Sequence, residues 1–84
     1  MDKEKILNQI FGIKNDVLEE ETLEMFDLYF LEKRRPNEIA KLLDTNQPNA
    51  CYRLQRACEV LAKELGQSYT DIVESLTFVR EDNG

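Results

Sequence analysis

The sequence predicts an all-α fold, a small bundle of four to five helices, and three observations favour this class. Apolar residues recur at three- and four-residue spacing through most of the chain, as on one face of a helix. No segment shows the alternation of a half-buried strand. The two prolines and two of the three glycines lie where helices are expected to start or stop.

The N-terminal segment predicts a helix near residues 2–11. Four apolar residues share its helical spacing: Ile6, Leu7, Ile10 and Phe11. Because glycine weakens a helix, we expect this one to break at Gly12. Residues 13–21 are ambiguous, since Val17 and Leu18 could extend a helix or dock a loop.

A further helix is predicted from about Thr22 to Lys33, and it carries apolar residues on more than one face. Three of them form one stripe, Leu23, Phe26 and Phe30, and three lie off it, Met25, Leu28 and Tyr29. A helix that is apolar nearly all round lies in the core or is covered by a partner. We expect core placement, with contact between two copies as the alternative.

A tight turn joins two helices in the middle of the chain. The run 38–43 predicts a short amphipathic helix, in which the small Ala40 lets a second helix approach closely. The residues expected on its buried face are Ile39, Leu42 and Leu43. Residues 44–46 form a polar turn. The next helix begins at Gln47 or Pro48, since proline is compatible with a helix in its first turn.

The helix after this turn shows one apolar stripe at about 100° per residue. The stripe consists of Ala50, Leu54, Ala57 and Leu61, with Leu65 at its edge. The opposite face consists of Tyr52, Arg56, Glu59 and Lys63, with Asn49 and Gln55 on the shoulders. Two helices joined in this way predict a helix-turn-helix, in which the first helix braces the second and the second presents its outer face to a DNA major groove.

A last helix is predicted after Gly66, which is a natural C-terminal stop for the helix before it. Ser68 with Asp71 three residues later resembles a capping box at its start. The helix is expected to run to about Val79. Its inward residues are expected to be Tyr69, Ile72, Val73 and Leu76. We expect it to complete the core, with an oligomer or partner surface as the alternative.

The two central helices carry a pattern found in a known family. The pattern is a Glu-Ile-Ala opening at 38–40, a Leu pair, a three-residue turn and Arg-Leu-Gln-Arg-Ala at 53–57, followed by Leu61. It resembles the C-terminal DNA-binding region, region 4, of sigma-70 family transcription factors, especially the extracytoplasmic-function class. The run at 25–31 is similar to the helix that precedes the motif in that family. The resemblance covers roughly residues 21–65, without the other sigma domains, and implies a DNA-binding transcription protein of a bacterium, a phage or a mobile element.

The candidate DNA-binding residues lie on these two helices and on the loop before them. They are Arg34, Arg35, Lys41, Gln47, Asn49, Tyr52, Arg53, Gln55 and Arg56. Gln47, Asn49 and Tyr52 are expected near base edges, where amide side chains suit adenine and guanidinium groups suit guanine. Arg56 would read a base or a phosphate. Lys41 and Arg53 would hold the DNA backbone.

Charge is unevenly distributed along the chain, whose net charge of −6 opposes DNA binding because phosphate is also negative. Residues 1–29 carry three basic and eight acidic groups, residues 30–58 six and three, and residues 59–84 two and six, which gives nets of −5, +3 and −4. The positive charge therefore coincides with the predicted helix-turn-helix. The basic loop before its first helix is an expected phosphate contact, with a solvated loop as the alternative. Arg53 and Arg56 could instead pair with acidic side chains of the flanking helices.

The sequence offers little for catalysis or metal binding. Histidine is absent and there is no glycine-rich phosphate loop, so no enzyme activity, metal or cofactor is expected. Cys51 and Cys58 are seven residues apart on one helix, about 10 Å, which is too far for a disulfide. We expect both to be reduced, partly buried small hydrophobes.

Composition and length favour one small intracellular domain over residues 1–84. No apolar run reaches membrane-spanning length and no signal-type apolar core follows the N-terminus, so we expect cytoplasmic localisation and no membrane partner. A chain of this size buries a modest fraction of its surface, and oligomerisation would add stability. A homodimer is therefore an alternative to a monomer.

Three functions fit these features. The first is a sequence-specific protein that binds double-stranded DNA and regulates transcription. The second is a non-enzymatic interaction module that binds RNA polymerase or a regulator, a role that the sigma resemblance also implies and that acidic flanks would suit. The third is a DNA-recognition subunit of the phage small-terminase type, which also uses a helix-turn-helix and oligomerises.

Overall fold

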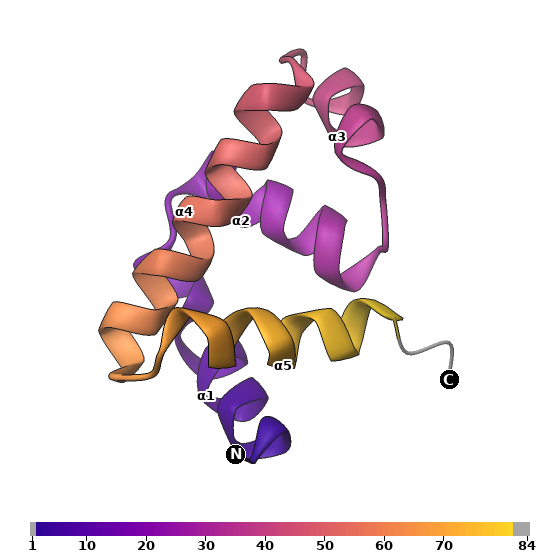
Figure 1. Cartoon of the computed structure of the whole chain (residues 1–84). Helices are drawn as coiled ribbons and strands as arrows, with labels where there is room; N and C mark the ends of the chain where they lie inside the picture. Colours follow the sequence, from indigo (N-terminus) through magenta and orange to yellow (C-terminus); the bar gives the residue numbers. More distant parts are fainter. Residues whose placement is uncertain (1, 82–84) are drawn as a thin grey trace.

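The computed structural model describes residues 2–81, and in that range the chain folds into five α-helices and one π-helical segment, with no strand (Figure 1). In chain order they are α1 (Lys3–Val17), α2 (Glu20–Phe26), the π-helical segment η1 (Asp27–Leu31), α3 (Pro36–Leu42), α4 (Gln47–Leu65) and α5 (Tyr69–Glu81). The predicted all-α class is confirmed. Over the same residues, the structure contains no helix that is both long enough and apolar enough to cross a membrane.

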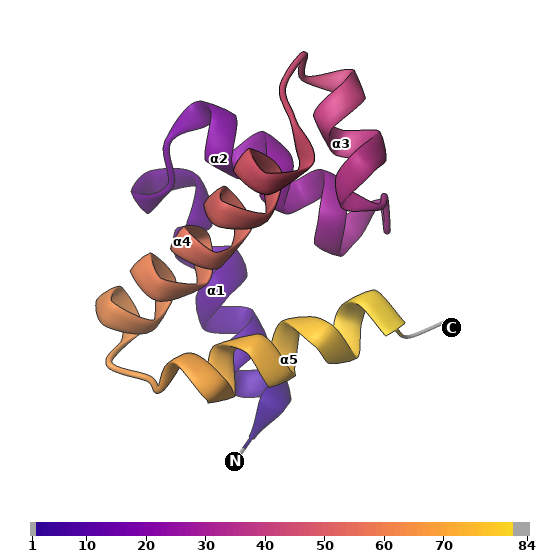
Figure 2. The same ribbon diagram turned by 45° about the horizontal axis from the view of Figure 1, so that its top comes forward.

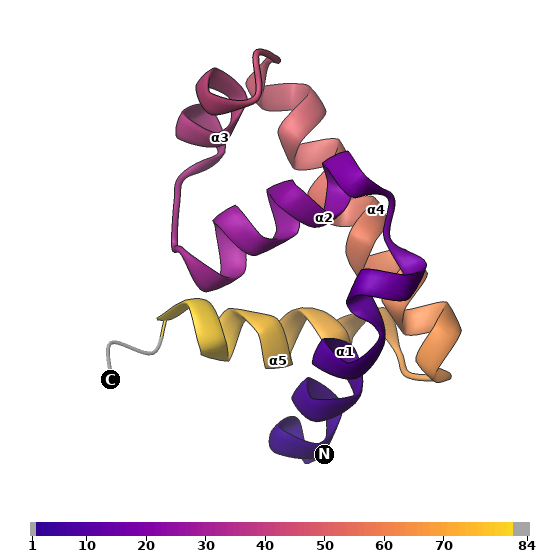
Figure 3. The ribbon, with the colours of Figure 1, turned by 180° about the vertical axis from the view of Figure 1, so that it is seen from behind.

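The longest helix, α4, lies at the centre of the bundle. It contacts each of the other four helices, and it crosses the molecule diagonally in Figure 1. In the view from behind, α1 and α2 lie in front of it (Figure 3). The last helix, α5, packs on α1 and η1. Figure 2 shows α3 and the turn that leads into α4 at the end of the molecule opposite the N-terminus, with α2 also at that end.

The apolar stripe predicted on α4 is buried. Ala50, Ala57 and Leu61 have no exposed surface. The facing segment supplies large side chains, of which Met25 and Phe26 are fully buried. The helix predicted from about residue 22 is therefore found as α2 continuing into η1, and it lies in the core as expected.

The prediction that the first helix breaks at Gly12 is wrong, because α1 continues to Val17. A Cβ at Gly12 would meet nothing within 4 Å, so the position is open and no close contact requires a glycine there. A single glycine inside a helix costs only about 1 kcal/mol relative to alanine. Ile6 and Ile10 are buried and hold the helix on the core. Beyond α1, Leu18 is buried and docks the connection to α2.

Two residues that were expected to be buried are exposed. Leu42 is 58% exposed. The inward side of α3 consists of Ile39, Ala40 and the half-buried Leu43, and at 100° per residue Leu42 lies roughly 110° from its centre. Tyr69 is exposed because it is the first residue of α5 and lines an open groove between α4 and α5.

The predicted boundary between the last two helices is confirmed. Gly66 ends α4 with a φ of 65°, in the left-handed region that glycine adopts readily. The Ser68 Oγ accepts a hydrogen bond of 3.1 Å from the Asp71 backbone N–H at the start of α5. Ile72 and Leu76 of α5 are fully buried, as predicted.

Candidate nucleic-acid interface

The connection between α3 and α4 is a short polar turn. The Thr45 backbone N–H donates to the Ala40 carbonyl at 2.8 Å. Asp44 has a φ of 54°, in the left-handed region that aspartate tolerates better than most residues with a Cβ. The Asn46 Oδ1 accepts from the Asn49 backbone N–H at 2.9 Å and so caps α4. With these contacts, α3 ends and α4 begins within four residues.

The two helices joined by this turn pack closely where both carry small residues. Ala40 is 5% exposed, and Ala50 is fully buried together with Ile39. A larger side chain at either alanine would force the two helices apart. The packing therefore determines which face of α4 is outward.

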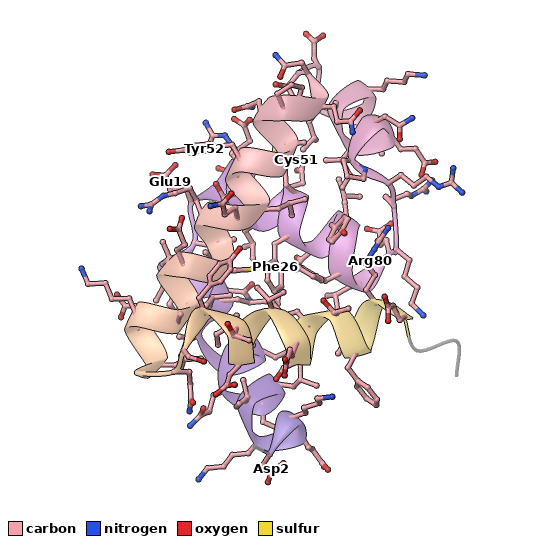
Figure 4. The ribbon with its side chains drawn as sticks, viewed as in Figure 1. Asp2, Glu19, Phe26, Cys51, Tyr52 and Arg80 are labelled. Carbon is pink, nitrogen blue, oxygen red and sulfur yellow. The ribbon has the colours of Figure 1, made fainter. Side chains whose placement is uncertain are left out.

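The outward face on the first half of α4 is mostly polar. It consists of Gln47, Cys51, Tyr52, Gln55 and Arg56, all of which are exposed. Tyr52 is 61% exposed, and in Figure 4 its side chain projects from α4 near Glu19. Four of the five residues are among the candidate DNA contacts, and the fold brings these four together on one surface.

The fifth residue of this face is Cys51, for which the expectation of partial burial is wrong. Cys51 is exposed, whereas Cys58 is buried. Burial raises the pKa of the Cys58 thiol to about 12, with a smaller contribution from the neighbouring Glu59 carboxylate. The sequence did contain a signal for Cys51, because it lies four residues from both Gln47 and Gln55 and so shares their face of the helix.

Arg53 contacts the start of α2 and the connection before it, not the outward face. Its Nη1 donates to the Thr22 Oγ1 at 3.3 Å and lies 3.7 Å from the Glu19 Oε2. Its Nε lies 3.7 Å from the Glu21 Oε1. The Nε is buried without a hydrogen-bond partner among the described residues. The alternative interpretation of Arg53, pairing with acidic side chains of a flanking segment, therefore matches its contacts.

Arg56 and Asn49 make contacts within their own segment. The Arg56 Nη1 lies 3.5 Å from the Glu59 Oε1 one turn further along α4, and both side chains are about half exposed. Asn49 is half-buried, and its Nδ2 donates to the Thr45 Oγ1 at 3.0 Å. Arg56 is thus at the surface, whereas the Asn49 amide already donates one hydrogen bond to the turn.

The remaining candidates lie on α3 and on the loop before it. Arg34, Arg35 and Lys41 are exposed. The Arg34 Nη1 lies 3.9 Å from the Glu38 Oε2, and the Glu38 Oε1 accepts from the Arg35 backbone N–H at 2.9 Å. Glu38 therefore links the loop to the first turn of α3, and the guanidinium of Arg35 is left at the surface.

Comparisons with protein-family models, with curated proteins and with solved structures find no match to this chain. The similarity to sigma region 4 therefore stays an interpretation of the pattern in residues 21–65.

Proposed function

We propose that the protein binds double-stranded DNA in the regulation of transcription, with α3 and α4 acting as a helix-turn-helix. The observation that supports this most directly is the exposed polar face on the first half of α4, held outward by the burial of Ala50, Leu54 and Ala57 on the opposite side of the helix. In a helix-turn-helix the second helix lies in the major groove, and its first turns contact base edges.

The side chains on this face suit that role. Gln47 and Gln55 can each donate to and accept from an adenine edge, and Arg56 can contact a guanine or a phosphate. Arg35 and Lys41 lie on the α3 side and are suited to phosphate groups of the backbone. This division of roles places base contacts on α4 and backbone contacts on α3 and its loop.

The charge distribution supports the same docking surface. Residues 30–58 have a net charge of +3, whereas the rest of the chain sums to −9, from −5 and −4. DNA phosphates attract the first region and repel the others. The acidic segments thus restrict the protein to one orientation on the duplex.

The experiment that tests the proposal is fluorescence anisotropy of a labelled random-sequence duplex, titrated with the protein at low and at near-physiological salt. We expect salt-sensitive binding that Arg56→Ala weakens by about 1–3 kcal/mol. Lys63→Ala is the matched control, because Lys63 is exposed on the same face two turns further along α4 and carries the same charge. Absence of binding at low salt, or an equal loss in both variants, would contradict docking through the first half of α4.

Cys51 offers a second test of the same docking. It lies in the middle of the proposed contact face, and it is the exposed one of the two cysteines. We expect one thiol of the native protein to react quickly with N-ethylmaleimide and saturating DNA to slow that reaction by at least tenfold. A Cys51 reaction rate that DNA leaves unchanged would contradict the proposed orientation of α4.

A module that binds RNA polymerase or another transcription protein is the second candidate. It is favoured by the net charge of −9 outside residues 30–58, which repels DNA but not a protein partner, and Leu42, 58% exposed on α3, is an apolar side chain that such a partner would cover. Co-purification with polymerase after nuclease treatment, lost on Leu42→Ser, would support this role. Salt-sensitive DNA binding unaffected by Leu42→Ser would support the first.

A further inference from the structure

The C-terminal part of α5 contacts the basic loop that precedes α3. This loop, residues 32–35, connects η1 to α3. In Figure 1 the end of α5 comes close to it, and Figure 4 shows Arg80 at this place. The contact joins the last described helix to a loop that contains two of the candidate phosphate contacts, Arg34 and Arg35.

The loop has an unusual backbone. The Glu32 N–H donates to the Asp27 carbonyl at 3.0 Å, and the Arg34 N–H donates to the Leu28 carbonyl at 2.9 Å. Between these two bonds, Lys33 has a φ of 59°. A residue with a Cβ disfavours this left-handed conformation, which persists where surrounding contacts hold it. Support for the loop therefore comes from η1, and contacts from elsewhere in the bundle add to it.

Arg80 supplies such support. Its Nη1 donates to the Tyr29 carbonyl at 2.5 Å and to the Arg34 carbonyl at 3.0 Å. Its guanidinium carbon lies 3.8 Å from the centre of the Tyr29 ring, which is cation–π geometry. The carbonyls near the end of a helix lack partners within the helix, and a cation there is favoured. One side chain thus bridges the end of η1 and the loop.

A chain of contacts then leads from Arg80 to the start of α3. The Arg34 carbonyl is bound by Arg80, and the Arg34 side chain pairs with Glu38 at 3.9 Å. The Glu38 carboxylate in turn accepts from the Arg35 backbone N–H at 2.9 Å. The position of both loop arginines relative to α4 therefore depends on a residue of α5.

We propose that Arg80 is a positioning residue for DNA binding: it holds the 32–35 loop so that Arg34 and Arg35 lie against the phosphate backbone of a duplex bound by α4. This inference rests on the proposed function. It gives α5 a role in DNA binding, although α5 lies outside the helices that would touch the duplex.

The test measures the salt dependence of DNA affinity for Arg80→Ala. The slope of log K against log salt changes by about 0.9 for each phosphate contact. Loss of the two loop contacts is therefore expected to make the slope shallower by about 1.8, whereas partial unfolding would lower the active fraction without changing the slope. Lys3→Ala is the matched control, because Lys3 also places a cation over an aromatic ring, 5.5 Å from the centre of the Phe78 ring on α5, but away from the loop.

A double-mutant cycle separates positioning from direct contact. If Arg80 acts through the loop, Arg80→Ala has no further effect on the slope in a protein that already carries Arg34→Ala and Arg35→Ala. A further change of about 0.9 in that background would overturn the inference, because Arg80 would then contact phosphate itself. An unchanged slope for Arg80→Ala alone, in a parent that does bind DNA, would also overturn it. If the parent itself does not bind DNA, the proposed function fails.

Hydrogen exchange tests the loop without DNA. The Arg34 amide, bonded to the Leu28 carbonyl, is expected to lose at least tenfold protection in Arg80→Ala. The Leu61 amide, in the C-terminal half of α4, should keep its protection in the same variant, which controls for global unfolding. Equal protection of the Arg34 amide in both proteins would overturn the supporting role of Arg80.

Discussion

Replacing Glu19 and Glu21 by glutamine is expected to strengthen DNA binding. In the free protein these two carboxylates lie 3.7 Å from the Arg53 guanidinium and hold it against the start of α2. A guanidinium released from them can turn toward the DNA backbone beside α4. The double variant therefore removes two competitors for the same cation.

The size of the effect follows from the exposure of the three groups. Ion pairs at the surface contribute about 0.2–1 kcal/mol each. The Glu19 side chain is 85% exposed and that of Glu21 is 51% exposed, against 31% for Arg53, so solvent screens both pairs and the lower half of the range applies. Two such pairs give about 0.4–1.2 kcal/mol, which corresponds to about two- to eightfold tighter binding.

The assay is again anisotropy with a labelled duplex over a range of salt. Glu20→Gln with Glu24→Gln is the matched control, because both residues are exposed on α2, carry the same charge as Glu19 and Glu21 and form no ion pair with a described residue. The Glu19 and Glu21 variant should also steepen the salt slope by about 0.9, for one new phosphate contact. An equal gain in the control would show that net charge alone is responsible, and no gain in either would refute a DNA contact by Arg53.

Two predictions concern stability. Burial raises the pKa of the Cys58 thiol from 9.0 to about 12, so the contribution of the protonated thiol to the free energy of unfolding is fully present below about pH 9 and is lost as the pH rises toward 12. Urea unfolding should show a loss of about 1 kcal/mol between pH 8 and pH 10 that Cys58→Ala abolishes. A loss of the same size in Cys58→Ala would contradict this cause. Ala50→Leu inserts a large side chain where α3 meets α4 and should cost about 1–3 kcal/mol, whereas Cys51→Leu on the exposed face should change the free energy of unfolding by at most about 0.5 kcal/mol; similar costs in both would contradict the packing of α4.

The helices and their inward faces follow from local pattern where that pattern is long and regular. The stripe on α4 repeats over 19 residues, so the buried positions of Ala50 and Leu61 can be predicted from spacing alone. The seven residues of α3 are too few to determine a face, and spacing alone places Leu42 on the wrong one. The break predicted at Gly12 does not occur because a helix held by distant packing tolerates a weak local propensity.

Some features of the candidate site can likewise be predicted from local spacing, whereas others depend on how the helices pack. The shared exposure of Gln47, Tyr52, Gln55 and Arg56 is a property of one helix, and the sequence predicts it. The partner of Arg53 is Glu19, 34 residues earlier, and the loop is held by Arg80 from the last helix. Contacts between such distant parts of the chain depend on how the helices pack, and no local spacing indicates them. Lys14 is a similar case, a buried lysine paired with Asp27 at 3.0 Å.

The central position of α4 determines how the protein unfolds and whether a fragment of it can fold. Since α4 contacts every other helix, no part of the bundle can be removed without uncovering apolar surface on α4. A peptide that contains only residues 36–65 would expose Leu54, Ala57 and Leu61 to water, and helices of this length are marginal without tertiary contacts. Folding should accordingly be one cooperative event, and the surface proposed for DNA should form and disappear together with the whole bundle.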